Sequence, residues 1–237
     1  MPRLCPPDVS SSQEGAWLLA LHSSTETLGL GLQRLGMPEE KSQLATFPLG
    51  RALSNQLFVC LESLLPAEQW PRLGRLAVAT GPGGFTGTRL TVVLARTLAQ
   101  QLHLPLEGIS SFQLAARRRL AAGELGLGRH GAAAGPFWLV QELPRHGVVA
   151  GLYEADPAAL AGLAERQPPR LFRSSAALEA AALALGCSGA PRVEAEPLLP
   201  ADVEQLLVFG QAAAAAGLAS PWQPVLPIYP TSPVEGG

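Results

Sequence analysis

The stretch ATGPGGFTGTRL, residues 79–90, lies between two apolar segments and decides how the first half of the chain is interpreted. It follows a predicted buried strand at 75–79 and leads into a predicted helix at 87–102. Glycine permits positive φ and close approach of the backbone, and the Thr86 hydroxyl can cap a helix. The stretch therefore predicts a tight turn from strand to helix.

This glycine turn matches neither of the common phosphate-binding motifs. A P-loop requires glycine, four residues and then Gly-Lys-Ser/Thr, whereas Thr88 follows Gly83 by five positions and no lysine is present. The dinucleotide motif Gly-x-Gly-x-x-Gly can begin at Gly81, but its last position is then Thr86. Free N–H groups at a helix start can still hold an anion. Composition favours a turn that shapes the chain, and an anion site stays open as the alternative.

Outward from the turn, apolar runs alternate with turn residues in an α/β pattern. In the first half we expect strands and helices in the order β-β-β-α-β-α-β-α, at 17–21, 28–32, 46–49, 51–65, 75–79, 87–102, 105–109 and 110–122. In the second half we expect a loop, two strands and three helices separated by proline-rich connections, at 123–135, 137–140, 148–153, 158–164, 175–185 and 202–216.

Composition limits the class of protein. The 237 residues are 47% apolar and 15% charged with a net charge of −2, which predicts a sizeable core and no polyanion-binding surface of its own. The only dense basic run, 117–119, is interpreted as a solvated helix face. Three cysteines without a CxxC pair fit a reducing compartment without disulfides or structural zinc. The first sixteen residues read as a loose tail, and no run is long and apolar enough to span a membrane, so we expect a cytoplasmic protein.

Two predicted helices, 51–65 and 87–102, are apolar nearly all round. A surface helix normally has one apolar stripe, and a helix that is apolar all round is covered on both sides. One sheet cannot cover both helices completely. Either a second domain or a partner chain is expected to cover the rest.

The segment LAVATGPGGFTGTRLTVVLARTLAQQLHLPLEGISSFQLAA closely resembles the TsaB (YeaZ) family. The family pattern is roughly Gly-Pro-Gly-Ser-Phe-Thr-Gly-x-Arg, an apolar helix, and then Pro-x-x-Gly-(Val/Ile)-Ser-(Ser/Thr)-Leu. The residues that match it are Gly81, Pro82, Gly83, Phe85, Thr86, Gly87, Arg89, Pro105, Gly108, Ile109 and Ser110. Gly84 and Phe112 depart mildly from it. The resemblance is specific over 17–116 and weak beyond, where Gln141 and the segment PIYP depart from the family pattern.

The resemblance implies an α/β fold of two tandem RNase-H-like domains, as in actin-like and sugar-kinase-like ATPases. The expected divisions are a disordered tail at 1–16, a first domain at 17–110 that helix 202–216 can complete, a diverged second domain at 111–200 and an extended proline-rich tail at 217–237. The implied function is that of a non-catalytic accessory subunit. It would bind the TsaD-type transferase, which forms N6-threonylcarbamoyladenosine in tRNA beside the anticodon.

The same resemblance implies the site and the partners. The helices at 51–65 and 87–102 would contact the TsaD paralogue, with a structural loop at Gly81, Pro82, Gly83, Phe85, Thr86 and Gly87. The predicted interface residues are Leu53, Leu57, Cys60, Leu61, Leu64, Arg89, Leu90, Val93, Leu94 and Thr97. A TsaE-type ATPase would join a larger complex, tRNA would be contacted only indirectly, and the chain alone could form a homodimer. No cofactor is expected in this chain; ATP or ADP and a metal would belong to the partner subunit or its interface.

Specific residues argue against two enzymatic alternatives. TsaD-like proteins bind metal through His-x-x-x-His on a helix, and none of the four histidines here has that spacing. Actin-like kinases and ATPases carry an Asp at the end of the first strand, where this chain has His22, a poor Mg²⁺ ligand. A diverged actin-fold ATPase or small-molecule kinase stays as the alternative function. A diverged copy with weakened function is also left open.

Overall fold

The computed structural model describes residues 15–125 and 135–231 of the chain. Most of the loose tail expected at 1–16 therefore lies outside the described residues. The elements in chain order are β1 (Trp17–His22), β2 (Thr27–Arg34), β3 (Gln43–Pro48), η1 (Gly50–Ala52), α1 (Leu53–Leu64), η2 (Ala67–Arg72), β4 (Leu73–Ala79), α2 (Phe85–Leu102), β5 (Leu106–Ile109), α3 (Ser111–Ala121), β6 (Phe137–Leu143), β7 (Gly147–Ala155), η3 (Leu160–Gly162), β8 (Leu163–Phe172), α4 (Ser175–Ala184), β9 (Arg192–Glu194) and α5 (Ala201–Ala215).

The first sheet has the strand order β3-β2-β1-β4-β5. β1 pairs antiparallel with β2 and parallel with β4, and β4 pairs parallel with β5. Alternation along β1 sends Leu19 and Leu21 to the face that α1 and α2 cover. Leu18 and Ala20 point to the opposite face, where α5 packs. The sheet is therefore covered by helices on both faces, as its almost continuously apolar strands require.

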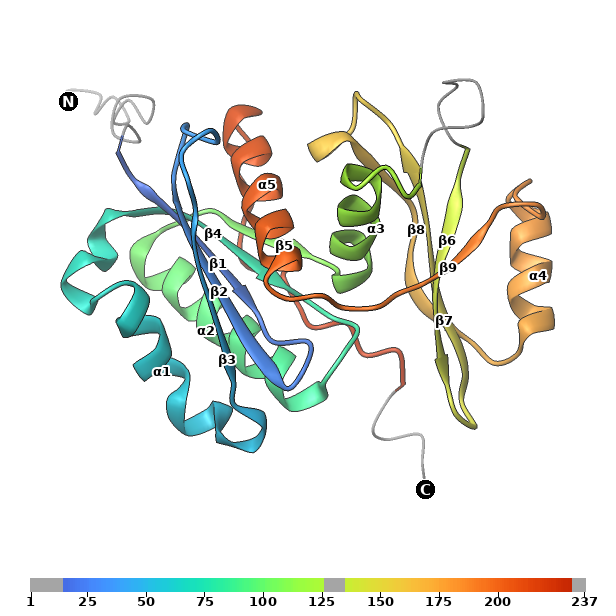
Figure 1. Cartoon of the computed structure of the whole chain (residues 1–237), viewed down its shortest axis with the longest axis horizontal. Helices are drawn as coiled ribbons and strands as arrows, with labels where there is room; N and C mark the ends of the chain where they lie inside the picture. Colours follow the sequence, from blue (N-terminus) through green and yellow to red (C-terminus); the bar gives the residue numbers. More distant parts are fainter. Residues whose placement is uncertain (1–14, 126–134, 232–237) are drawn as a thin grey trace, which may run out of the picture.

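The second sheet has the order β8-β7-β6-β9, and α4 packs on one of its faces through Leu178 and Ala182. α3 and α5 lie between the two sheets (Figure 1). One core runs through this middle layer and joins side chains of both sheets, such as Ala77 and Leu139, to Leu114 and Phe209 of the two helices. The mixed α/β architecture with two sheets is the predicted fold class.

The second half of the chain corrects part of the predicted element order. The helix predicted at 158–164 is wrong: Leu160–Gly162 forms a single short turn, and β8 begins at Leu163. The prolines of the segment QPPR lie within β8 rather than in a connection. β8 is the edge strand of its sheet, where missing N–H donors cost little. The short strand β9 was not predicted.

The residues after α5 run back across the first sheet. The Leu106 N–H donates to the Ser220 carbonyl oxygen at 2.9 Å, and the Ile228 N–H donates to the Thr80 carbonyl oxygen at 2.7 Å. Val225 is buried between these points. The described part of the proline-rich tail is therefore extended and packed on the fold. The exact domain divisions stay predictions.

Candidate functional site

The glycine turn is packed against the loop that follows β1. The Gly84 N–H donates to the Ser24 carbonyl oxygen at 2.7 Å. A Cβ at Gly83 would collide with that same oxygen, and a Cβ at Gly87 would collide with the Ser23 carbonyl oxygen. Glycine is therefore required at both positions because two backbone segments meet there.

The start of α2 differs from the prediction. The helix begins at Phe85 rather than at Gly87, its N-cap residue is Gly84, and no side chain caps it. Thr86 thus lies inside the first helical turn, with its side chain exposed. The interpretation of Thr86 as the helix cap is wrong.

Two further segments hold the glycine turn. The Ser111 N–H donates to the Gly81 carbonyl oxygen at 2.7 Å, and the Ser111 hydroxyl donates to the Pro82 carbonyl oxygen. From the other end of the chain, the Tyr229 ring packs on the Phe85 ring with centroids 4.6 Å apart. Contacts with the β1 loop, the start of α3 and residues 228–229 together fix the direction in which α2 leaves its strand.

His22 occupies the end of β1, the position where actin-like enzymes carry an acid. Its side chain is fully buried, and neither ring nitrogen has a hydrogen-bond partner among the described residues. Burial lowers the pKa of His22 from 6.5 to about 4. His22 pairs with Gly29 across the strands, and a Cβ at Gly29 would touch Val203 and Leu199. Because paired residues share a face, His22 lies beneath the start of α5 as a neutral imidazole.

The predicted interface residues divide between the core and the surface. Five of them are buried against the first sheet, namely Leu53, Leu57, Cys60, Leu61 and Leu94. Leu64 and Leu90 are half-buried, and Arg89, Val93 and Thr97 are exposed. Half of the predicted residues therefore face the sheet, because a core stripe and a partner stripe are both apolar and the sequence pattern does not distinguish them.

Outward-facing apolar residues lie on both helices of this pair. Phe58 and Val59 of α1 are 54% and 59% exposed, and Val93 of α2 is 53% exposed. We call these three residues the α1–α2 apolar face. Phe58 and Val59 were not among the predicted interface residues, although their positions next to Leu57 and Cys60 place them off the core stripe of a helix.

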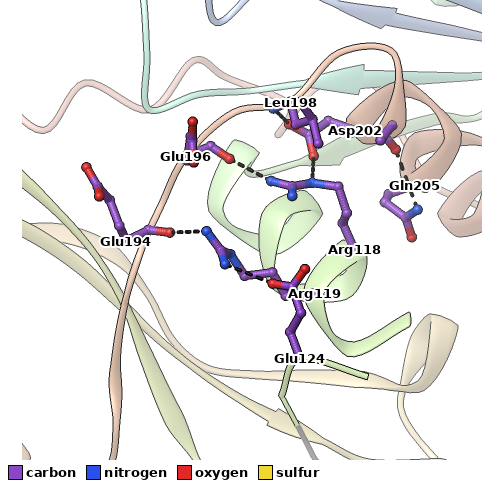
Figure 2. A network of polar contacts seen from close by, with 9 residues as sticks. Arg118, Arg119, Glu124, Glu194, Glu196, Leu198, Asp202 and Gln205 are labelled. Carbon is purple, nitrogen blue, oxygen red and sulfur yellow. Dashed lines mark hydrogen bonds and ion pairs between the residues drawn. The ribbon is translucent and has the colours of Figure 1, made fainter. Parts of the chain in front are cut away.

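The basic run on α3 is engaged within the fold. Arg118 donates to the Asp202 carboxylate at 2.7 Å and to the Glu196 carbonyl oxygen at 2.6 Å (Figure 2). Arg119 donates to the Glu194 carbonyl oxygen at 3.2 Å and to the Glu124 carboxylate at 2.9 Å.

The third arginine, Arg117, donates to the Ala161 carbonyl oxygen at 2.7 Å. The run therefore joins α3 to the segment before α5 and to the turn before β8. Its interpretation as a solvated face is wrong.

Two kinds of feature are absent from the described residues. Within 15–125 and 135–231, no three His, Cys, Asp or Glu side chains are grouped so that they could hold a metal ion. No helix in that same part of the chain is long and apolar enough to cross a membrane.

Comparison with known proteins gives concordant matches. Residues 49–128 match the family model described as TsaD, tRNA N6-adenosine threonylcarbamoyltransferase. The tRNA threonylcarbamoyladenosine biosynthesis protein TsaB of Bacillus subtilis (strain 168) is 36% identical over 107 residues. That match covers 43% of this chain and 44% of the relative, so it spans less than half of the relative's length.

Two solved structures from Pseudomonas aeruginosa share the fold over nearly the whole chain. YeaZ has a TM-score of 0.63 at 17% identity and covers 90% of this chain and 99% of its own. An uncharacterised protein with similarity to peptidase YEAZ has a TM-score of 0.62 at 19% identity and covers 91% of this chain and 100% of its own. The family model and the curated relative each match part of this chain and support its likeness to the TsaB (YeaZ) family, and the two solved structures show the shared two-sheet fold.

Proposed function

We propose that the chain is a non-catalytic accessory subunit that binds a TsaD-type transferase in the formation of N6-threonylcarbamoyladenosine in tRNA. The similarity to TsaB supports a role in this biosynthesis. The observation that supports binding to a transferase is the α1–α2 apolar face. Both helices already bury one side against the sheet, yet Phe58, Val59 and Val93 point outward. Exposed apolar groups that form a continuous patch are typical of an interaction site.

The geometry of the glycine turn supports the same function. Glycines at 83 and 87 let the start of α2 pack against the β1 loop, and Ser111 and Tyr229 hold the turn from two other sides. A fixed helix direction keeps Val93 in a constant position on the surface. A rigid, preorganised surface loses less entropy when a partner binds.

The surroundings of His22 argue against the alternative of an ATPase or kinase. Such an enzyme needs an acidic group at the end of β1 to hold Mg²⁺ and phosphate. Here a neutral imidazole fills that position and is covered by the start of α5. Any ATP, ADP or metal would therefore act in the partner subunit or at its interface.

The engaged arginine run supports an indirect role toward tRNA. Phosphate contacts dominate the affinity of proteins for nucleic acids. Arg118 and Arg119 instead donate to Asp202, Glu124 and backbone carbonyls. The chain alone is proposed to bind tRNA weakly, while the assembly with the transferase and a TsaE-type ATPase provides the tRNA surface.

The test is copurification of the chain with the TsaD paralogue of its own cells. Val93→Glu places a charge on the α1–α2 apolar face and should weaken association about tenfold or more, because the carboxylate loses water without gaining a partner. Leu183→Glu is the matched control, since Leu183 is a 70% exposed apolar residue on α4. If Val93→Glu associates with the transferase as tightly as the parent does, the assignment of this face is refuted.

Sedimentation of the parent and Val93→Glu without the transferase tests the homodimer. If the same face joins two copies, only the parent should sediment as a dimer, and the dimer should dissociate as the transferase is added. A dimer that persists in Val93→Glu would show that the copies meet elsewhere.

A further inference from the structure

A groove lies on the side of the first sheet that α5 covers. It has a volume of about 700 Å³ and lies between α5 and the turn that joins β2 to β3. Its lining is mainly apolar and includes Leu35, Pro38, Leu207, Val208 and Ala212. Pockets of this size and character usually hold a ligand or an apolar segment of a chain.

The two glutamines of the groove already have partners, and the other polar side chains that line it are Ser42 and Glu204. The Gln211 side-chain amide donates to the Gln33 side-chain oxygen at 3.1 Å and to the Arg34 carbonyl oxygen at 2.6 Å. Its own oxygen accepts from the Gly36 N–H at 3.0 Å. The Gln33 amide donates to the carbonyl oxygens of Pro38 and Glu40. The groove therefore offers apolar contact area and fits an apolar occupant better than one that requires buried hydrogen bonds.

The described chain begins at the rim of this groove. The Leu35 N–H donates to the Ala16 carbonyl oxygen at 2.9 Å, and a Cβ on Gly15 would lie 3.7 Å from the Arg34 guanidinium. Leu35 and Gly36 both line the groove. Gly15, which follows residues 1–14 in the chain, therefore lies beside the apolar surface.

The sequence of that segment suits the groove. Residues 4–9, LCPPDV, combine Leu, Cys, Val and two prolines within one short run. The ten residue-to-residue steps from Cys5 to Gly15 span up to about 33 Å when extended, more than a groove at the tether point requires. A short tether also gives an effective concentration in the millimolar range, and the prolines reduce the entropy lost when the segment is ordered.

We propose that residues 4–9 of this chain bind in the groove between α5 and the β2–β3 turn. The segment would cover apolar side chains of α5 and hold the β2–β3 turn against that helix. This interaction is independent of the proposed partner face, because α1 and α2 lie on the opposite face of the first sheet.

Cross-linking through the native Cys5 tests the proposal. In a Cys187→Ser background of the full chain, a second cysteine is placed in the groove by Val208→Cys or by Ala212→Cys. Ala180→Cys, on the exposed side of α4, is the matched control, and Cys5→Ser removes the native partner. After mild oxidation, mass spectrometry should find an intramolecular disulfide from Cys5 to the groove variants, at least about tenfold more than to the control.

Each other outcome overturns the proposal. Equal bridging to α4 would show that the segment samples the whole surface, and no bridging at either groove position would show that it lies elsewhere. A disulfide-linked dimer at the groove positions would assign the groove to a second copy of the chain.

Hydrogen exchange gives a second, independent measurement. Deletion of residues 1–14 should increase amide exchange at 34–42 and 204–215, and a synthetic peptide of residues 1–14 should restore the protection. Leu4→Asp together with Val9→Asp in that peptide should abolish the restoration. Unchanged exchange after the deletion would also overturn the proposal.

Discussion

The Arg118 guanidinium lies 2.7 Å from the carboxylate of Asp202, although the two residues are 84 positions apart in the sequence. Asp202 is fully buried, and its second carboxylate oxygen accepts from the Leu198 N–H at 2.6 Å. Burial is the largest influence on this carboxyl and raises the pKa of Asp202 despite the neighbouring arginines. The pair joins α3 to the start of α5 between the two sheets.

Arg118→Ala should lower the free energy of unfolding by about 3–5 kcal/mol, because it leaves a buried carboxylate without its partner. Urea denaturation followed by circular dichroism measures the loss. Arg192→Ala is the control, since Arg192 pairs with Glu179 on the surface at 3.8 Å and should change stability by about 1 kcal/mol at most. Equal losses in the two variants would show that the Arg118–Asp202 pair contributes no more than a surface pair.

His22 should make the fold sensitive to mild acid. Its folded-state pKa of about 4 lies below the ordinary value of 6.5, so between these values the unfolded chain binds a proton that the folded chain does not. Stability should therefore be complete above pH 6.5 and fall by about 3 kcal/mol toward pH 4.

The difference between the parent and His22→Leu isolates this contribution. Glu165 and Asp202 have raised pKa values, so their effect has the opposite sign, and it is common to both proteins. The parent should lose stability relative to the variant as the pH falls. Parallel stability profiles from pH 7.5 to 4 would contradict the buried neutral state of His22.

Gly83→Ala and Gly87→Ala should each lower the free energy of unfolding by about 1–3 kcal/mol, because the added methyl group collides with a backbone carbonyl oxygen of the β1 loop. Gly84→Ala is the control: its Cβ would have no atom nearer than 3.7 Å, and its φ is −58°. Thermal denaturation of the three variants checks this order. A Gly84→Ala variant as unstable as the other two would indicate that helix capping, rather than close packing, selects glycine there.

Single glutamate substitutions should separate the two sides of α1 and α2. Leu57→Glu and Leu61→Glu bury a charge against the first sheet and should prevent folding. Phe58→Glu and Val93→Glu replace exposed side chains and should leave circular dichroism unchanged while association with the transferase is lost. If Leu61→Glu is folded and soluble, the Leu61 side chain does not face the first sheet.

The sequence predicts the first sheet and its helices well because each element there has a clear local signal. Alternating apolar runs, prolines and the glycine turn separate the strands from α1 and α2. The predicted helix at 158–164 failed because an Ala-rich segment has high helix propensity, whereas most of it forms the turn before β8 and its last two residues pair with β7. Propensity is a local property, and strand pairing depends on partners far along the chain.

The site is harder to predict than the fold because burial is not a local property either. Leu57 and Phe58 are both large and apolar neighbours, yet one faces the sheet and the other faces solvent. The basic run shows the same limit, since nothing near Arg118 in the sequence indicates that Asp202 will lie beside it. Such a pair is set by the three-dimensional fold, which brings α3 and the start of α5 together between the two sheets.

The first sheet obtains its covering from late parts of the chain: α5 packs on β1 and β2, and residues 220–229 pack on β5 and the glycine turn. A ribosome that has released only the first 110 residues has therefore exposed strands whose α5-facing side, including Leu18 and Ala20, is still bare. Chaperones would meet this open intermediate during synthesis. For the same reason, expression of residues 17–110 alone should yield an aggregating fragment, and a soluble one needs α5 and the segment after it supplied together.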